Sequence, residues 1–141
     1  MLIDYEAGMW NPLYHDVANY LNEWVCDNTQ IAYFMENWPS NPEITALTRE
    51  YFLLLKQREH GDCPRSEVEG LWSLELEACV SAVAQVKQCM LLNNFSNALW
   101  AILVLSEEDE TNDRAFHWEF LRGRCLMIKT CFELFGIAKI V

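Results

Sequence analysis

One nearly continuous apolar segment, residues 95–106, limits what this chain can fold into more than any other feature. Its side chains are apolar on almost every face, and such a helix is stable in water only when other elements cover it. The rest of the chain can form helices that pack on this segment, because 52% of all residues are hydrophobic and apolar residues recur at helical spacing. The sequence therefore predicts a mainly α protein in which this segment is buried.

About five helices are expected after a short strand stub. Residues 1–3 are apolar and look like the last turn of a buried strand, which is too short to pair by itself. The residues between the first two helices, 27–40, are expected to form a loop. The helices are expected over residues 12–26, 41–60, 66–92, 95–106 and 113–135.

Start and stop signals place the ends of these helices. Proline at position 42 suits a helix start, and Ser66 with a glutamate three residues later forms a capping box. Asp113 can cap the last helix, and Gly136 can end it. The adjacent residues Asn93 and Asn94 are expected to interrupt helical structure and so to separate the third helix from the fourth.

Charge narrows the class of partner. The chain has a formal net charge of −11 at pH 7. Proteins that bind nucleic acid present basic surfaces, so this balance disfavours a nucleic-acid partner and suits cationic or metal-bridged ones. An acidic surface that only keeps a protein soluble gives the same charge.

Cysteine spacing and hydropathy favour a cytoplasmic protein. The six cysteines form no C-x-x-C pair and no zinc-site spacing, and thiols in apolar helical surroundings are ordinarily reduced. The chain does not start with a basic-then-apolar leader. The longest apolar run, residues 98–105, is shorter than the about 20 residues that cross a bilayer. We therefore expect no secretion and no membrane span.

Two groups of polar side chains near the N-terminus are candidates for a site. Asp4 and Glu6 alternate along an extended segment, and a carboxylate pair after a buried strand is a common way to hold Mg²⁺. Asp16, Asn19 and Glu23 share one face of the first helix. Acidic residues on an amphipathic helix also commonly face water without further function, so spacing alone leaves both interpretations open.

These residues belong to a longer pattern. The segment LIDYEAGMWNPLYHDVANYLNEW closely resembles a signature of choline and ethanolamine kinases, in which I-D-[FY]-E-Y is followed by N, D-[IV]-[AG]-N and E-[WF]. Farther along, Trp38-Pro39, Leu99-Trp100 and the F-x-W that ends at Trp118 look like diverged versions of family segments. The resemblance spans nearly the whole chain, and it is strong only as far as Trp24.

The resemblance implies that residues 1–141 are the C-terminal portion of a protein-kinase-like domain, which is α/β when complete. The family transfers the γ-phosphate of ATP to the hydroxyl of choline or ethanolamine, with Mg²⁺, in phospholipid biosynthesis. Each matched position then has an implied role. Asp4 and Glu6 match metal ligands, Glu23, Trp100 and Trp118 match amine-binding residues, and Asn11, Asp16 and Asn19 match supporting positions.

The chain departs from the family in three ways. Ala7 replaces a tyrosine, and Leu103 stands where the family has a second tryptophan of its cation cage. The family's catalytic loop, H-x-D-x-x-x-x-N, precedes the I-D-[FY]-E segment and is not found in these 141 residues, nor is the lobe that covers ATP. The resemblance therefore implies no catalytic residue here, and we expect the isolated chain to be inactive.

Alternative functions remain open. A truncated relative of the family that docks on a full-length kinase would be a non-catalytic helical binding protein. A kinase of another hydroxylated amine, such as an aminoglycoside, is a third possibility, and the match over residues 11–24 argues against it. The sequence does not decide the oligomeric state, and a homo-oligomer is compatible with it.

Overall fold

The computed structural model describes residues 13–27, 32–61, 64, 66–67, 69–70, 76–107 and 113–136. Most of these residues are helical, which confirms the prediction of a mainly α chain. The prediction that residues 95–106 are buried is wrong for most of the large side chains, because Leu99, Ile102 and Leu103 are exposed. The elements in chain order are α1 (His15–Glu23), β1 (Cys26–Asp27), β2 (Ala32–Tyr33), a 3₁₀ turn (Met35–Asn37), α2 (Asn41–His60), α4 (Leu76–Ser106) and α5 (Arg114–Phe135).

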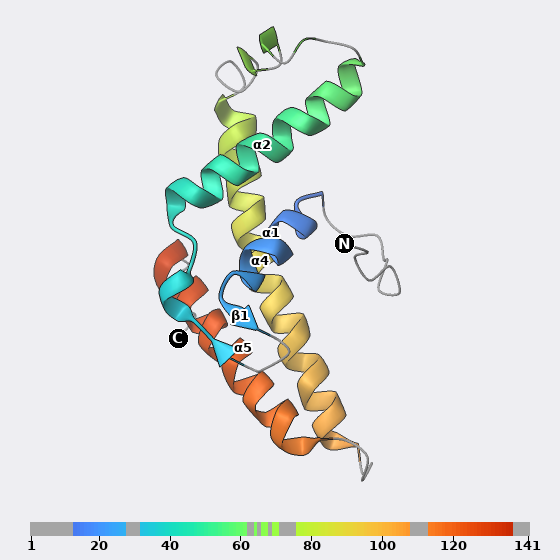
Figure 1. Cartoon of the computed structure of the whole chain (residues 1–141), viewed down its shortest axis with the longest axis vertical. Coiled ribbons are helices and arrows are strands. Elements are labelled where there is room, and N and C mark those ends of the chain that lie inside the picture. Colours follow the sequence, from blue (N-terminus) through green and yellow to red (C-terminus); the bar gives the residue numbers. More distant parts are fainter. Residues whose placement is uncertain are drawn as a thin grey trace.

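Helix α4 is the element on which the other helices pack (Figure 1). α2 crosses its N-terminal part, α1 crosses its middle, and α5 runs antiparallel along its C-terminal part. The two short strands form an antiparallel hairpin in which Cys26 pairs with Tyr33 and Asp27 with Ala32. The hairpin connects α1 to the segment that leads into α2.

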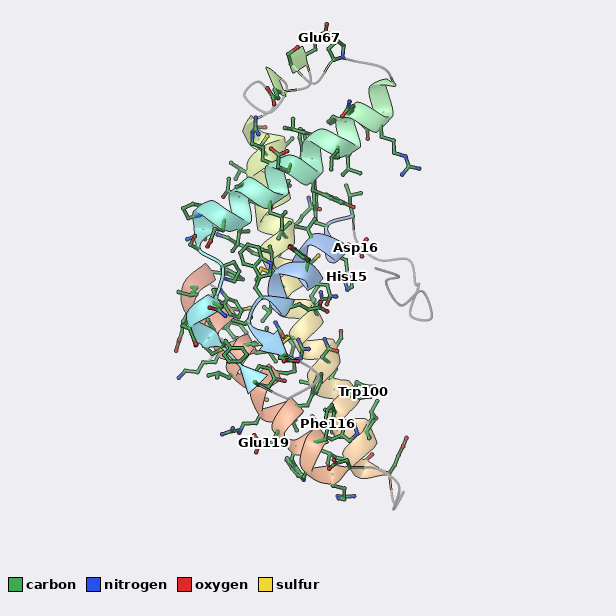
Figure 2. The ribbon with its side chains drawn as sticks, in the orientation of Figure 1. His15, Asp16, Glu67, Trp100, Phe116 and Glu119 are labelled. Atoms are coloured by element: carbon green, nitrogen blue, oxygen red, sulfur yellow. The ribbon has the colours of Figure 1, made fainter. Side chains whose placement is uncertain are left out.

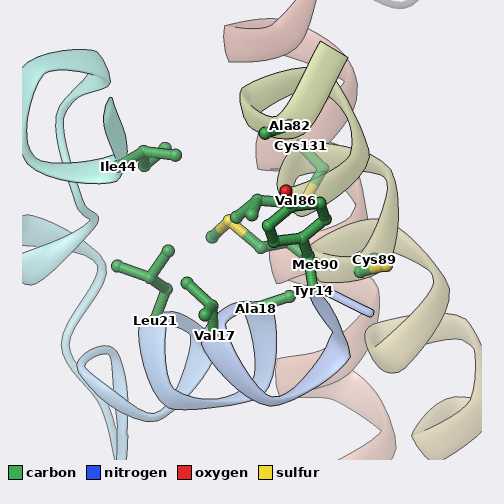
Figure 3. Packing of buried hydrophobic residues seen from close by; sticks show 10 residues of the cluster. All are labelled: Tyr14, Val17, Ala18, Leu21, Ile44, Ala82, Val86, Cys89, Met90 and Cys131. Atoms are coloured by element: carbon green, nitrogen blue, oxygen red, sulfur yellow. The ribbon is translucent and has the colours of Figure 1, made fainter. Parts of the chain in front are cut away.

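The hydrophobic core lies where α1 and α2 meet α4 (Figure 3). α1 supplies one face because Val17, Ala18 and Leu21 are close together on the helix surface and all are buried. Tyr14, just before α1, Ile44 of α2 and Cys131 of α5 complete the cluster with apolar side chains of α4 (Figure 3). The α4 members of the cluster are Ala82, Val86, Cys89 and Met90.

The predicted break at Asn93 and Asn94 is wrong. Both residues lie inside α4, which continues without interruption to Ser106. The amide of Asn94 donates to the carbonyl oxygen of Met90 one turn earlier, 2.8 Å away, and the side chain has further partners on other elements. Because the buried amide of Asn94 is paired within the fold, its weak helix propensity does not end the helix. The described residues consequently contain four α-helices, where five were expected.

The segment between α1 and α2 also differs from the prediction. α1 ends at Glu23 rather than near Cys26, and part of the expected loop is the hairpin and the 3₁₀ turn. A backbone hydrogen bond of 2.7 Å from Phe34 to the carbonyl of Val25 holds the hairpin against the end of α1. The apolar stub at residues 1–3 lies outside the described residues.

The predicted helix ends at α2 and α5 are confirmed. Ser40 caps α2, and its side chain and the carboxylate of Glu43 form a reciprocal capping box. Asp113 caps α5 by accepting a hydrogen bond of 3.0 Å from the backbone N–H of Phe116. Gly136 ends α5 in the left-handed conformation, with φ of +64°. The capping box predicted at Ser66 borders residues that the structure does not describe.

The capping box of α2 predicts a pH dependence of stability. The Ser40 hydroxyl and then the Ser40 N–H, both hydrogen-bonded to the carboxylate, lower the pKa of Glu43 from its ordinary value of 4.5. A lowered pKa in the folded state stabilises the fold above pH 4.5, and this contribution is lost as the pH falls through the lowered pKa. In Glu43→Gln the neutral amide does not titrate. We expect the urea midpoints of wild type and Glu43→Gln to converge between pH 7 and pH 3; a gap that stays constant would contradict the prediction.

Five cysteines lie in the described residues, and all five are free thiols. Cys79, Cys89 and Cys131 are buried, as predicted for thiols on apolar helix faces. Burial raises the pKa of Cys131 to about 12. Because the thiolate is the reactive form, Cys131 is expected to be unreactive at neutral pH.

Candidate functional site

The predicted metal ligands, Asp4 and Glu6, lie outside the described residues, as does Asn11. Among residues that the structure describes, no group of three or more His, Cys, Asp or Glu side chains is arranged to hold a metal ion. The carboxylates of Asp4 and Glu6 are the type of donor that Mg²⁺ prefers. Their role as metal ligands therefore stays a prediction.

Asp16, Asn19 and Glu23 lie on the exposed side of α1, opposite its core face. The amide of Asn19 donates to Glu23 Oε1 over 3.3 Å, so the two side chains adjoin on consecutive turns. Asp16 points to solvent, and its Oδ1 lies 3.8 Å from His15 Nδ1 (Figure 2). α1 thus presents a carboxylate oriented by a neighbouring amide, next to Trp24.

The polar residue of α1 that sequence reasoning missed is Asn22, which is fully buried. Its amide donates to the carbonyl oxygen of Met90 over 3.0 Å, and its Oδ1 accepts from Asn94 Nδ2 over 3.2 Å. Asn94 Oδ1 in turn accepts from Arg124 Nη1 over 3.2 Å. This network ties α1, α4 and α5 together at one level of the core.

Arg124 is buried although it carries a charge, with a side chain only 4% exposed. Its guanidinium lies 4.7 Å from the centre of the Phe120 ring, a cation–π arrangement that partly compensates for lost hydration. Burial raises the pKa of Tyr33, and the nearby Arg124 opposes that rise. The hairpin therefore closes over this buried cation.

Tyr33 also fixes the position of the hairpin on α5. Its hydroxyl donates to the carbonyl oxygen of Phe120 over 3.1 Å. Its ring lies directly over Gly123, where a Cβ atom would collide with three ring carbons. Gly123 is therefore required for this close approach and not for backbone freedom.

Trp100 belongs to an aromatic cluster between the end of α4 and the start of α5 (Figure 2). Its ring contacts those of His117 and Phe120, with ring centres 5.2 Å and 5.7 Å away. Phe116 stacks on Phe120 within the same cluster. Figure 2 places Trp100 well along α4 from Asp16, so the cluster and the exposed face of α1 are separate features.

Trp118 lies on a different side of α5 from Phe120, since two helical positions correspond to about 200° of rotation. Its side chain is 58% exposed. Leu103, which stands at the position of the family's second cage tryptophan, is exposed as well. The assignment of Trp100 and Trp118 to an amine cage remains a prediction.

A shallow depression of about 440 Å³ lies beside the C-terminal end of α1. Trp24, Trp38 and Asn37 line it together with the carboxylates of Glu36 and Glu43. Indole faces and carboxylates are the groups that bind organic ammonium ions. Sequence reasoning did not predict this depression, because its lining comes from the residue that follows α1, from the 3₁₀ turn with Trp38, and from the first turn of α2.

The continuity of α4 bears on one earlier inference. From Glu77 to Ser106 this helix is long and apolar enough to cross a membrane, judged by length and composition alone. The longest uninterrupted apolar run remains residues 98–105, although the helix that contains it is longer than the one predicted over residues 95–106. The expectation of no membrane span stays a prediction. Other parts of the fold bury 39% of the most apolar window of this helix, and a core helix of a soluble protein can have the same length and composition.

Comparison with known proteins leaves the resemblance without independent support. No protein-family model matches the chain, and neither the curated proteins nor the solved structures contain a match.

Proposed function

We infer that this chain is the C-terminal part of a cytoplasmic kinase of the choline/ethanolamine type, which phosphorylates the hydroxyl of a small amine with ATP and Mg²⁺. The observation that carries the inference is the exposed face of α1, on which Asn19 orients the Glu23 carboxylate. This pairing falls within the segment that resembles the kinase signature. A fixed carboxylate on an exposed helix face is suited to bind an ammonium group.

The proposed roles follow from the chemistry of each side chain. Asp4 and Glu6 would hold Mg²⁺, which neutralises charge on the transferring phosphate. Glu23 would bind the ammonium group. The aromatic enclosure by Trp100 and Trp118 rests on the resemblance alone, because Trp100 lies apart from the exposed face of α1 in this fold (Figure 2). The general base is assigned to the H-x-D-x-x-x-x-N loop, so no residue of this chain is proposed as catalytic.

Amine binding tests the proposal directly. We expect choline to bind the purified chain and Glu23→Gln to weaken binding about 10-fold, because the ammonium loses a charged partner. Isothermal titration calorimetry measures this, with tetramethylammonium as a probe for the cationic group alone. Glu107→Gln, which neutralises an exposed carboxylate after α4, is the matched control. Failure of choline to bind, or equal weakening by both variants, would contradict the role of Glu23.

An activity assay tests the proposal that the catalytic base is absent from these 141 residues. The purified chain, mixed with ATP, Mg²⁺ and choline or ethanolamine, is expected to form no phosphorylated amine because it lacks the proposed base. Formation of phosphocholine or phosphoethanolamine above the level of a blank without protein would show this expectation to be wrong.

Mapping the 5′ end of the transcript adds a second test. An H-x-D-x-x-x-x-N sequence encoded in frame just before Leu2 is the expected result for a kinase of this type.

A second candidate function is a non-catalytic helical protein that docks on a full-length kinase. The observation that favours it is the number of large apolar side chains that remain exposed on α4 and α5, among them Leu99, Leu103 and Leu134. This candidate predicts saturable binding to a complete amine kinase without binding of the amine itself. Titration of the chain into such a kinase, compared with the choline titration, separates the two candidates.

A further inference from the structure

Ser106 is the last residue of α4, and its side chain is exposed. The hydroxyl donates to the carbonyl oxygen of Leu103 over 2.6 Å, one turn earlier on the same helix. The last four carbonyls of a helix receive no hydrogen bond from the helix's own backbone, so this bond satisfies one of them. The hydroxyl thus lies at the surface, and its bond to Leu103 is local to the helix end.

The residues that follow Ser106 form the longest acidic run of the chain. Positions 107–110 are Glu, Glu, Asp and Glu, so each of the four positions after the serine carries a carboxylate. Negative charge at a helix C-terminus opposes the negative end of the helix dipole and weakens the last turn. A weak helix end opens locally at a small fraction of the cost of global unfolding. A modifying enzyme can therefore reach this serine while the core stays folded.

A serine followed by carboxylates suits a protein kinase whose substrate groove is basic. Kinases select substrates by the pattern of charge around the acceptor, and lysine and arginine side chains of such a groove pair with carboxylates. No other serine of the chain has more than two acidic residues in the next four positions. Ser66 has two, and Arg65 directly before it carries the opposite charge. Ser81, exposed on the same helix as Ser106, has none. Charge therefore favours Ser106 as the acceptor.

A larger domain around this chain is not expected to cover Ser106. Carboxylates are costly to remove from water unless each one gains a cationic partner. The last turn of α4, residues 103–106, contains no basic residue that could neutralise the four carboxylates that follow it. Ser106 is also separate from the residues assigned to the metal and the amine, so the inference does not depend on the proposed function.

We propose that Ser106 is phosphorylated by an acid-directed serine/threonine protein kinase, and that the phosphate opens the last turn of α4. In the transfer, Ser106 Oγ forms a bond to the γ-phosphorus of ATP, the bond from this phosphorus to the β–γ bridging oxygen breaks, and ADP leaves. The hydroxyl proton passes to the base of that kinase. The product has no hydroxyl to donate to Leu103, and its phosphate places close to two negative charges at a helix C-terminus beside carboxylates, where such a group disrupts the helix.

The first experiment incubates the purified chain with casein kinase II, an acid-directed kinase, with ATP and Mg²⁺, and locates phosphate by peptide mass spectrometry. We expect phosphate on Ser106, and about 10-fold slower incorporation in Glu107→Gln/Asp109→Asn, because the groove loses two charged contacts. Ser106→Ala is expected to abolish incorporation, and Ser81→Ala, the matched control on the same helix, is expected to leave it unchanged. A blank without the added kinase measures any phosphorylation by the chain itself.

Circular dichroism verifies that every variant folds. No incorporation into the folded wild type would overturn the proposal, as would equal incorporation into wild type and Ser106→Ala. Phosphate found chiefly on Ser66 or Thr111 would also overturn it, because charge would then not select the serine at the end of α4.

The effect on the helix end has its own test. Hydrogen exchange followed by mass spectrometry compares the phosphorylated and unmodified chains. We expect exchange about 3-fold faster in the last turn of α4 after phosphorylation, since a misplaced charge at a helix end has an effect of this size. The same helix around Ala82 is the internal control and is expected to exchange at an unchanged rate. Unchanged exchange at residues 103–106, or equal acceleration in both segments, would overturn the proposed local opening.

Discussion

Asn94→Ala is expected to destabilise the fold by about 3 kcal/mol, because it removes the residue at the centre of the buried polar network. The substitution deletes the acceptor of Arg124 Nη1 and the donor to Asn22 Oδ1, and it leaves both groups buried. An unsatisfied buried group keeps its full desolvation cost, and that cost is greatest for a charged group. Urea unfolding followed by circular dichroism measures the loss.

The control for this prediction lies one turn away on the same helix. Asn97 is half-buried and donates to the carbonyl oxygen of Asn93, a local bond within α4. Asn97→Ala is therefore expected to change stability by less than about 1 kcal/mol. The Asn22→Ala/Asn94→Ala double variant should lose less than the sum of the single variants, because the two share a hydrogen bond. Equal effects at positions 94 and 97 would refute the network as described.

Gly123→Leu is the second substitution with a large expected effect. The new side chain would occupy the space of the Tyr33 ring and force the hairpin away from α5. The displaced hairpin would lose the Tyr33 hydroxyl bond to Phe120 and uncover Arg124. We expect a loss of about 3 kcal/mol, the upper range for overpacking, even though leucine favours the helix more than glycine does.

Gly70→Leu provides the comparison, because a Cβ at Gly70 meets no atom within 4 Å. This substitution is expected to be neutral or slightly stabilising. Removing the obstructing ring should recover part of the stability, so Gly123→Leu combined with Tyr33→Ala should be less costly than the sum of both changes. Additive effects, measured by thermal unfolding, would show that the two residues do not compete for one space.

The features that sequence predicted correctly are local ones. Asp113 caps the start of α5 and Gly136 ends it, as predicted, because a cap depends on residues within one turn of the helix end. Val17 and Leu21 recur at helical spacing and are buried on one face of α1, whereas Leu13 and Tyr20, which belong to the same apolar pattern, are exposed. Asp16, Asn19 and Glu23 share one face of α1, as their spacing predicted, and the structure shows that this face is exposed.

The features that sequence missed depend on contacts between distant residues. Asn93 and Asn94 read as a helix break because propensity describes isolated residues, whereas Asn94 is bonded to Asn22, 72 positions away. Gly123 gave no positional signal beyond being a glycine inside a helical pattern. Such a glycine can mark a close approach, but only the fold shows that Tyr33 is the residue that approaches.

The candidate site was predictable only in part. The Asn19–Glu23 pair lies on one face, as the spacing of the two residues indicated. The ring contacts of Trp100 with His117 and Phe120 come from the antiparallel packing of α4 and α5, which helical periodicity alone does not specify. The depression beside Trp24 combines three segments for the same reason.

The arrangement of helices along α4 implies that the protein opens in stages. α2 packs on the N-terminal part of α4 (Figure 1). It lies away from the hydrogen bonds that Asn94 makes with Asn22 and Arg124, and away from the contact of Tyr33 with α5. Detachment of α2 would uncover Ile44 and its neighbours while the α4–α5 pair stays closed. Amide protons of α2 should therefore exchange with deuterium through a partial opening, whereas those around Met90 and Asn94 should exchange only when the whole molecule unfolds.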